Sequence, residues 1–469
     1  MDAAALRLTH RTGNFFQPHH AKSPANVGVV GDGKRVRTMK SFPGRLNLFQ
    51  ATMLDWRDAH PYNAVHAVRV ERALDIAAAT DAIAAELTRA GLTGLELDRE
   101  RCRYAWRGGA PSVSLETIDA GQDWQRTLEA AFERQLNAPF AANGAMNPFR
   151  FFVMPVDDRF FLGLAYDHFV AGGDSIIVLL NAIVDRYIGT AHDDPPLRLY
   201  PRTHARLFVR EPWRFLRGIT RFPALAKSCR RTIRPRYRDA SDAHNAFTLL
   251  ELDGATYGAL RNAAKAWGVT LNDAVLALLL LAQDAILPDR DMRKRRRELA
   301  VASIINLRGA HGEDPRGTFG QFLSSFRVSH PVPEGITLRE LAGDVHRATA
   351  RIKREKLYLV TLFAMAVHRG LGRFGTPQER MQSYAKSYPV GAGVSSLNVD
   401  ASWRRGANLP APLYIRGVPT GPLSPIVVAV TTAGERMHLG VSYRTAAFTA
   451  DQISGIGRHI LERIHSLSP

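Results

Sequence analysis

Cysteine is almost absent from this chain of 469 residues, which contains only Cys102 and Cys229. Two cysteines in unrelated contexts indicate neither a disulfide framework nor a metal site, and they fit a reducing cytoplasm. The opening residues, MDAAALRLTHRTGN, lack the basic-then-apolar order of a secretory signal. We therefore expect a cytoplasmic protein.

Long apolar runs are also missing. A helix that crosses a bilayer needs about 18 or more consecutive apolar residues, whereas the longest candidate, around 274–282, is short enough for a buried helix. Apolar residues make up 45% of the chain and charged residues 23%, which is typical of globular proteins. Because the chain exceeds one ordinary core, we expect two domains of about 200 residues each.

Acidic side chains are scarce relative to basic ones, with 44 Asp and Glu against 62 Lys and Arg and a net charge of +18. Such a surplus attracts acidic partners: nucleic acid, an anionic membrane, a phosphorylated cofactor or an acidic protein. A solvated arginine-rich surface explains the charge equally well. We expect no nucleic-acid partner, because no recognised binding motif accompanies the charge.

The charge is concentrated in one segment, residues 201–238, where twelve Arg or Lys stand against a single glutamate. Apolar residues are interleaved with them: Phe208, Trp213, Phe215, Leu216, Ile219 and Phe222. One interpretation is a basic linker whose apolar side packs on the protein. The other is an amphipathic face that brings residues 208–238 into peripheral contact with the inner membrane or with a carrier protein.

Strand-like and helix-like patterns alternate in both halves, and no repeat of 20–50 residues is present. Expected elements include strand-like runs at 95–106, 319–330 and 245–252 and a helix at 450–465. We predict an α/β (α+β) fold in four parts. These are an extension (1–40), a first subdomain (41–200), a basic linker (201–244) and a second subdomain (245–469).

The stretch 159–187 organises the first half. It opens as an alternating apolar strand, turns at the small residues 171–173 and continues as a helix, for which Asp174 or Ser175 is the expected N-cap. One face of the strand ends in His168, and Asp167 points the other way. A strand end can hold a histidine over a cleft without burying it. The pattern alone fits a satisfied core histidine as well as a catalytic base.

Residues 167–175, DHFVAGGDS, resemble the active-site segment of the condensation-domain acyltransferase superfamily. This superfamily includes nonribosomal peptide condensation domains, polyketide-associated acyltransferases and wax ester synthases, and its pattern is His-His-x-x-x-Asp-Gly, often followed by x-Ser. His168 matches the second histidine, Gly173 the glycine and Ser175 the serine. Five further segments resemble the superfamily in order: 50–63, 268–277, 305–322 (with Gln321 in place of asparagine), 394–398 and 441–448.

The resemblance spans about residues 42–465 and implies two chloramphenicol-acetyltransferase-like subdomains, arranged as a V around a central tunnel. It implies a standalone acyltransferase of natural-product or lipid biosynthesis, in which His168 is the general base. The acyl donor would be acyl-CoA or the phosphopantetheinyl thioester of an acidic acyl or peptidyl carrier protein. The acceptor would be a small-molecule alcohol or amine, and no cofactor would be bound permanently.

The same resemblance suggests roles for the turn. The backbone amide of Gly172 or Gly173 would stabilise the oxyanion, and the missing side chains would let a phosphopantetheine arm pass close to the chain. Two positions depart from the pattern: Asp167 replaces the first histidine, and Gly172 replaces the aspartate. That aspartate bonds to an arginine in the superfamily and fixes the loop, a part that Asp174 could take over.

These departures keep two other hypotheses open, a non-catalytic binding or scaffold protein and a lipid acyltransferase at a membrane surface. Four more residues are predicted either to line the tunnel or to be structural: Asn306, Arg308, Ser396 and Asn398. Ser395-Ser396 lacks the Gly-x-Ser-x-Gly turn of a hydrolase nucleophile. His19 and His20 lack a partner at metal-ligand spacing, so we expect no metal site.

Overall fold

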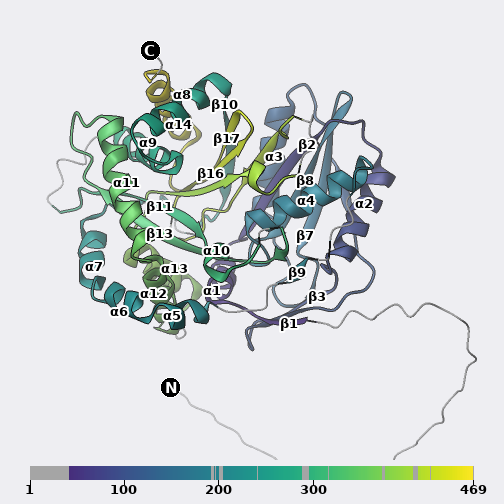
Figure 1. Cartoon of the computed structure of the whole chain (residues 1–469), viewed down its shortest axis with the longest axis horizontal. Helices are drawn as coiled ribbons and strands as arrows, with labels where there is room; N and C mark the ends of the chain where they lie inside the picture. The colour runs from purple at the N-terminus through teal and green to yellow at the C-terminus, as the bar shows by residue number, and fades with distance from the viewer. Residues whose placement is uncertain are drawn as a thin grey trace, which may run out of the picture. The chain divides into compact units, whose positions relative to one another are not determined.

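Two large β-sheets, one built mainly from the first half of the chain and one from the second, organise this computed structural model (Figure 1). The structure describes residues 42–191, 195, 197–199, 204–239, 241–287, 295–314, 316–371, 375–404, 410–422 and 424–467. The predicted extension 1–40, with His19 and His20, lies outside these residues. Contacts separate Met1–Met39 from Lys40–Pro469, and everything below concerns the second unit.

The first sheet has five strands in the order β15-β2-β8-β7-β5. Their bounds are β2 (Asn63–Val70), β5 (Leu115–Thr117), β7 (Phe149–Val156), β8 (Arg159–Asp167) and β15 (Tyr414–Gly417). The β7–β8 hairpin is local in sequence, but β15 comes from the far end of the chain and pairs antiparallel with β2. The predicted subdomain boundaries stay predictions, and β15 shows that the second half completes the sheet of the first.

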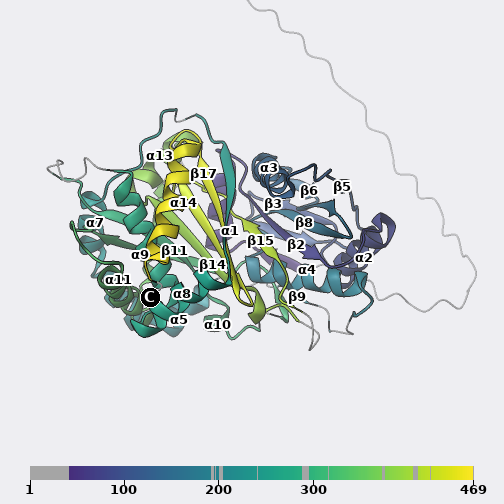
Figure 2. The same ribbon diagram turned by 90° about the horizontal axis from the view of Figure 1, so that it is seen from above.

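The alternation along β8 assigns its side chains to two cores, as the sequence predicts. Phe160, Leu162 and Leu164 pack in the same cluster as residues of α2 (Ile76–Arg89) and α4 (Gly173–Tyr187). Phe161 and Ala165 face α3 (Trp124–Asn137) on the other side. Figure 2 shows the sheet between α3 and α4. Each apolar side chain buried in this way contributes roughly 1.5–3 kcal/mol.

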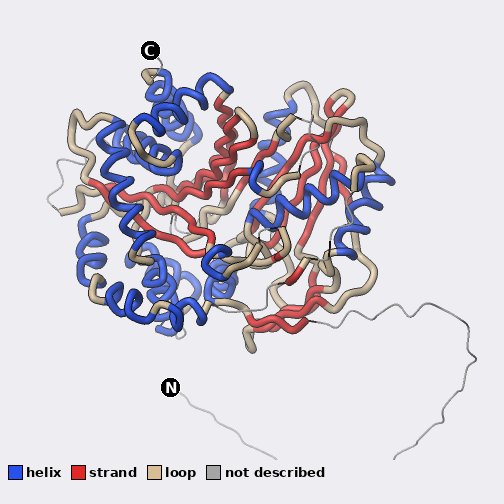
Figure 3. Tube along the Cα trace, in the orientation of Figure 1, coloured by secondary structure: helices blue, strands red, loops and turns tan. Residues whose placement is uncertain are grey.

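The second sheet has six strands in the order β10-β17-β16-β14-β11-β13. Their bounds are β10 (Asn245–Leu252), β11 (Leu299–Asn306), β13 (Leu323–His330), β14 (Ala392–Asn398), β16 (Ile426–Ala433) and β17 (Arg436–Arg444). One face packs on α8 (Gly254–Ala266), α9 (Leu271–Ala285), α11 (Leu338–Arg354) and α14 (Ala450–His465). These helices are blue beside the red strands in Figure 3. The strand at 245–252 and the helix at 450–465 are therefore confirmed.

Two strand-like runs are interrupted in the structure. The run 95–106 is a hairpin of β3 (Leu95–Asp98) and β4 (Arg103–Trp106), because Cys102 adopts a left-handed turn conformation with φ 52°. β3 and β4 belong to a four-stranded sheet with β1 (Phe42–Arg45) and β6 (Gly144–Met146). The run 319–330 breaks after β12 (Thr318–Phe319), which pairs with β9 (Arg198–Leu199). Residues 320–322 are thereby free to contact the candidate site.

The basic segment forms three helices, α5 (Ala205–Arg210), α6 (Pro212–Ile219) and α7 (Phe222–Arg231). Part of its apolar side packs on the protein: the ring centroid of Phe215 lies 5.0 Å from that of Phe208 and 5.3 Å from that of Phe363 in α12 (Tyr358–Leu371). Three other apolar side chains are exposed, Val209 by 79%, Trp213 by 81% and Leu216 by 50%. The packing expected of a linker is therefore present on one face, and contact of the other face with a membrane or a carrier protein stays a prediction.

Within the described residues, no single helix combines the length and apolar composition needed to cross a bilayer. Only α8 and α9 together meet that test, and they are bent by 107° at their junction. In the same part of the chain, no three His, Cys, Asp or Glu side chains are grouped so that they could hold a metal ion.

Candidate active site

His168 follows the last residue of β8, and two hydrogen bonds fix its position. Its backbone N–H donates to the carbonyl of Tyr62 (3.1 Å), and its Nδ1 lies 3.2 Å from the carbonyl oxygen of Ala171. A carbonyl only accepts hydrogen bonds, so Nδ1 carries the proton and Nε2 is left as an acceptor. The imidazole stacks on the Tyr62 ring at 5.8 Å and meets Tyr166 edge-on.

The expectation that His168 escapes burial is wrong, because its side chain is only 8% exposed and lies within a cavity wall. The pKa of His168 is lowered to about 4, chiefly by burial; the bond to Ala171 opposes this shift and the positive charge of Arg416 adds to it. The imidazole is therefore neutral at pH 7. Its Nε2 has no hydrogen-bond partner among the described residues.

The cavity beside His168 has a volume of about 1100 Å³, including its solvent-open part. The first half contributes Tyr62, His66 and Asp174, and the second half contributes one face of the six-stranded sheet. That face carries alternate residues of β11 and β14: Ala302, Ile304, Asn306, Gly393, Ser395 and Leu397. Three residues at the intervening positions of these strands, Ser303, Val394 and Ser396, line the cavity as well. The cavity lies between the two halves, as the resemblance implies.

Helix α4 begins at Gly173 with Gly172 as its N-cap, so the predicted cap at Asp174 or Ser175 is wrong. The Ser175 hydroxyl is engaged elsewhere: it donates to the Gly320 carbonyl (3.2 Å) and accepts from the Gly320 N–H (3.1 Å). The Gly172 N–H also donates to the Gly320 carbonyl (3.0 Å), which removes Gly172 as an oxyanion donor. The backbone N–H of Gly173 remains the candidate oxyanion donor, because it lies in the first helical turn, where backbone donors lack intrahelical partners.

The space at the two glycines is filled by the protein itself. A Cβ on Gly173 would lie 2.3 Å from Cδ1 of Leu397, and one on Gly172 would lie 3.3 Å from Oε1 of Gln321. These glycines therefore allow close packing between the two halves. The passage of a phosphopantetheine arm close to these glycines stays a prediction, and Gly173 lines the cavity.

Asp167 points away from His168, as strand alternation predicts, and forms a buried ion pair with Arg57. Burial raises the pKa of Asp167 to about 6, and Arg57 opposes that shift. Removing either partner would leave a buried charge without compensation, which is strongly destabilising. Asp167 thus anchors α1 (Leu48–Arg57) to the end of β8 and does not line the cavity.

Asp174 lines the cavity, and its carboxylate accepts a hydrogen bond from the side-chain amide of Asn306. Burial raises its pKa, and Arg308 and Arg416 oppose the rise. Arg308 bonds Ser175 and the carbonyl of Thr318 (2.7 Å) and does not line the cavity. Asn306 is therefore a lining residue and Arg308 a structural one, and the hydrogen bond of Asp174 goes to an asparagine and not to an arginine.

The other two predicted residues, Ser396 and Asn398, also differ in whether they line the cavity. Ser396 lines the cavity and its hydroxyl donates to the side chain of Asn272 (2.8 Å). Asn398 accepts from the N–H of Asp400 (3.0 Å) and caps the short 3₁₀ helix Val399–Ala401. It is not among the residues that line the cavity, so its part is structural.

Gln321 holds the loop that carries His168, a role that the sequence did not reveal. Its fully buried side-chain amide donates to the carbonyls of His168 (2.9 Å) and Ala171 (3.2 Å). Its own backbone carbonyl accepts from Asn47 (3.0 Å). The sequence feature that points to this role is the glutamine at a position where the superfamily has asparagine, because its additional methylene lets the side-chain amide reach further.

Arg416 on β15 is the second residue that the sequence did not reveal. It is 1% exposed, and its guanidinium donates to the Thr431 hydroxyl (2.9 Å) and to the carbonyls of Ser395 (2.7 Å) and Val430 (2.8 Å). Burial lowers its pKa to about 10, and it forms no ion pair with any described residue. A buried cation without a carboxylate is costly. The sequence feature that points to its burial is a single arginine within the otherwise apolar run 413–418.

The free nitrogen of Arg416, Nη1, lies 3.4 Å from the position of a Cβ on Gly173, and Arg416 lines the cavity. His66 is nearby, with its Nδ1 2.7 Å from the Tyr414 hydroxyl. Burial lowers the pKa of His66 well below its usual value. The cavity therefore brings together a neutral imidazole that accepts a proton and a cation with a free donor.

We expect the depressed pKa of His168 to make the protein less stable in mild acid. The unfolded histidine titrates near 6.5 and the folded one near 4, so its contribution is fully present above pH 6.5 and is lost as pH falls toward 4. Between pH 7.5 and 5.5 the loss is on the order of 1 kcal/mol. Urea unfolding at both pH values should therefore show a drop smaller by roughly 1 kcal/mol in His168→Gln than in the natural protein. An identical drop in both would contradict this.

No protein-family model matches the chain, and no curated protein matches it either. Solved structures do. The first condensation domain of the calcium-dependent antibiotic synthetase, in complex with a substrate analogue, has a TM-score of 0.66 at 16% identity, over 91% of this chain and 97% of that chain. The starter condensation domain of rhizomide synthetase, in complex with C8-CoA, has 0.63 at 14%, over 91% and 94%. The X-domain from teicoplanin biosynthesis has 0.57 at 19%, over 93% and 96%.

These similarities cover nearly the whole length of each chain, and at such low identities they concern the fold. The two sheets, the helices that pack on them and the cavity between the two halves agree with that likeness. The chain adopts the condensation-domain fold, a pair of chloramphenicol-acetyltransferase-like subdomains.

Proposed function

We propose that the protein transfers an acyl group from a thioester to a hydroxyl or amine acceptor, with His168 as the general base. The observation that carries the proposal is the His168 imidazole, whose Nδ1–H is held by Ala171 while Nε2 is free in a cavity between the two halves. A neutral imidazole held in this tautomer accepts a proton at Nε2 without further rearrangement.

In the proposed reaction the acceptor O–H or N–H attacks the thioester carbonyl while Nε2 of His168 takes its proton. The carbonyl oxygen becomes an oxyanion, for which the backbone N–H of Gly173 and Nη1 of Arg416 are the candidate donors. Collapse of this intermediate breaks the carbon–sulfur bond. The thiolate leaves and receives the proton from His168, so that the products are an ester or amide and a free thiol.

The donor is proposed to be acyl-CoA or an acyl or peptidyl carrier protein. The net charge of +18 favours either, because CoA carries phosphates and carrier proteins are acidic. The structurally similar rhizomide synthetase domain was solved with C8-CoA, which supports a CoA thioester as the first donor to test. Turnover with free CoA thioesters and a KM that rises steeply with salt would favour CoA, and activity only with a carrier would favour the protein donor.

The experiment that tests the proposal is thiol release from a panel of acyl-CoA and acyl-carrier thioesters, with mixed alcohol and amine acceptors. We expect release that depends on both the donor and the acceptor. Release without an acceptor would indicate hydrolysis and contradict the proposal. The absence of release across the panel would also contradict it and would favour a binding role. The X-domain from teicoplanin biosynthesis, which was solved in complex with OxyB, is a structural neighbour with a protein partner.

A second candidate is the same reaction at a lipid surface, favoured by the exposed α5–α6 surface, which we define as Val209 of α5 with Trp213 and Leu216 of α6. Exposed arginines 210, 214 and 217 surround it. Apolar side chains among cations suit an anionic bilayer. We expect sedimentation with phosphatidylserine vesicles at low salt, and at least about 10-fold weaker binding in the double variant Trp213→Ser, Leu216→Ser. The matched control is Ile76→Ser on α2, since Ile76 is also 50% exposed. No sedimentation, or equal loss in the control, would contradict the candidate.

A further inference from the structure

A second cavity, of about 1390 Å³ including its solvent-open part, lies under α7, α12 and α13 (Pro377–Ser387). Apolar side chains dominate its walls: Phe222, Leu225, Ala364, Met365, Val367 and Leu371. Val367 and Leu371 are exposed by 43% and 77% although they are apolar. No acidic residue is among the described residues that line it. Such a wall suits an aliphatic group.

The second cavity adjoins the His168 cavity. Three residues line both, namely Trp56, Ser325 and Tyr388. Aromatic contacts lead from one to the other: the Trp56 ring centroid lies 6.1 Å from that of Tyr384 and 5.3 Å from that of Tyr62, which stacks on His168. A ligand whose reacting group sits at His168 therefore has an apolar space directly beyond this shared wall.

Trp56 supplies an independent observation at the shared wall. Its side chain is 4% exposed, and its indole Nε1–H has no hydrogen-bond partner in the described structure. A buried donor without a partner is destabilising, and native proteins satisfy nearly all such groups. The unsatisfied donor thus belongs to a side chain that lines both cavities.

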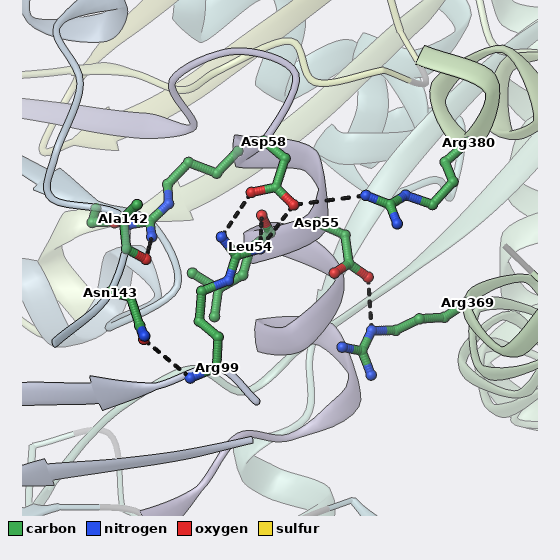
Figure 4. Close-up of polar contacts among 10 residues, drawn as sticks. Leu54, Asp55, Asp58, Arg99, Ala142, Asn143, Arg369 and Arg380 are labelled. Carbon is green, nitrogen blue, oxygen red and sulfur yellow. Dashed lines mark hydrogen bonds and ion pairs between the residues drawn. The ribbon is translucent and has the colours of Figure 1, made fainter. Parts of the chain in front are cut away.

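Ion pairs fasten two of the three helices that cover the second cavity, α12 and α13. Asp55 of α1 pairs with Arg369 of α12 (2.7 Å), and Asp58 faces Arg380 of α13 (3.8 Å) and Arg99 (2.7 Å) (Figure 4). In Figure 4 both aspartates point from α1 toward these arginines. The cavity is thus framed by helices tied to the element that carries Trp56, which supports a preformed binding site.

We propose that the second cavity binds the aliphatic chain of one of the two substrates, while the reacting end of that substrate lies at His168. This inference rests on the proposed function for the identity of the ligand as a substrate, but chain binding itself does not require turnover. Two sources share this chemistry, the acyl group of the thioester and a long-chain alcohol or amine acceptor. The experiments below separate them.

The first experiment measures binding of decanoate and decan-1-ol by calorimetry to the full chain. In Ala364→Trp an indole would fill the cavity from α12, and in Ala226→Trp from α7. We expect at least 10-fold weaker binding in both. The matched control is Ala366→Trp, because Ala366 is exposed on the same helix outside the lining. Absence of chain binding to the natural protein, or equal affinity in the two lining variants and the control, would overturn the inference.

The second experiment compares donors of two and ten carbons with acceptors of two and ten carbons. If the acyl chain occupies the cavity, Ala364→Trp raises KM at least 10-fold for the ten-carbon donor and leaves the two-carbon donor unchanged. If the acceptor occupies it, the effect moves to decan-1-ol. Turnover with equal KM for all pairs in both proteins would overturn the inference and leave the acyltransferase proposal intact. Failure of turnover would contradict the proposed function. Calorimetry would still show whether the second cavity binds an aliphatic chain.

Discussion

Replacing His168 with alanine should lower kcat for acceptor-dependent thiol release by about 100-fold or more, the scale on which a general base contributes. The reason is geometric: Nε2 is the free nitrogen of an imidazole whose other nitrogen is fixed on Ala171. Without the imidazole, the proton of the acceptor hydroxyl or amine must pass to water. The measurement is steady-state thiol release with the best donor and acceptor pair, together with circular dichroism to verify folding.

His60→Ala provides the matched control. His60 is a buried histidine, 5% exposed, whose burial also lowers its pKa to about 4, but it does not line the cavity. We expect this variant to keep activity near that of the natural protein. Equal losses in His60→Ala and His168→Ala would assign the effect to stability. Full activity in His168→Ala would show that His168 is not the base.

The sequence predicted the parts of the fold that depend on local patterns. β8 was predictable because a period of two assigns each side chain to one of two cores, and α14 because its apolar residues recur at helical spacing. The hairpin at Cys102 was not, since a positive φ at a non-glycine residue leaves no pattern in the sequence. The resemblance of 167–175 predicted that His168 lies at a cavity between the two halves, which periodicity alone did not, and the structure has it in the wall of such a cavity.

The rest of the site depends on contacts between residues far apart in the chain. Gln321 is 153 residues from His168, and β15 joins the sheet of the first half from the second half. The roles predicted around the turn were wrong for the same reason. The Gly172 N–H and the Ser175 hydroxyl form hydrogen bonds with Gly320, so Gly172 is not an oxyanion donor and Ser175 is not the N-cap. Local rules for caps and oxyanion donors cannot anticipate a partner supplied by a distant segment.

Arg416→Met should lower kcat by about 100- to 1000-fold, the scale for removing one oxyanion donor. Arg416 is the charged donor with a free nitrogen in the His168 cavity, and no described carboxylate lies within ion-pair distance of it. The substitution removes the charge and keeps an apolar side chain in the buried site. A buried charge that lacks an ion-pair partner is costly to the folded state. Its removal should therefore lower the free energy of unfolding by less than the transition-state stabilisation that the fall in kcat represents.

A structural role for Arg416 is separated from a catalytic one by the pH dependence of kcat/KM. The positive charge of Arg416 helps to lower the pKa of His168 to about 4, so the natural protein should keep its activity down to about pH 5. Removing the charge raises that pKa, and the acid limb in Arg416→Met should therefore move to higher pH. Arg416→Lys keeps the charge but loses the hydrogen bonds to Ser395 and Val430, so its acid limb should stay in place while kcat falls. An acid limb that is the same in all three proteins would show that the charge of Arg416 does not act on His168, and unchanged kcat in Arg416→Met would show that it does not act on the oxyanion.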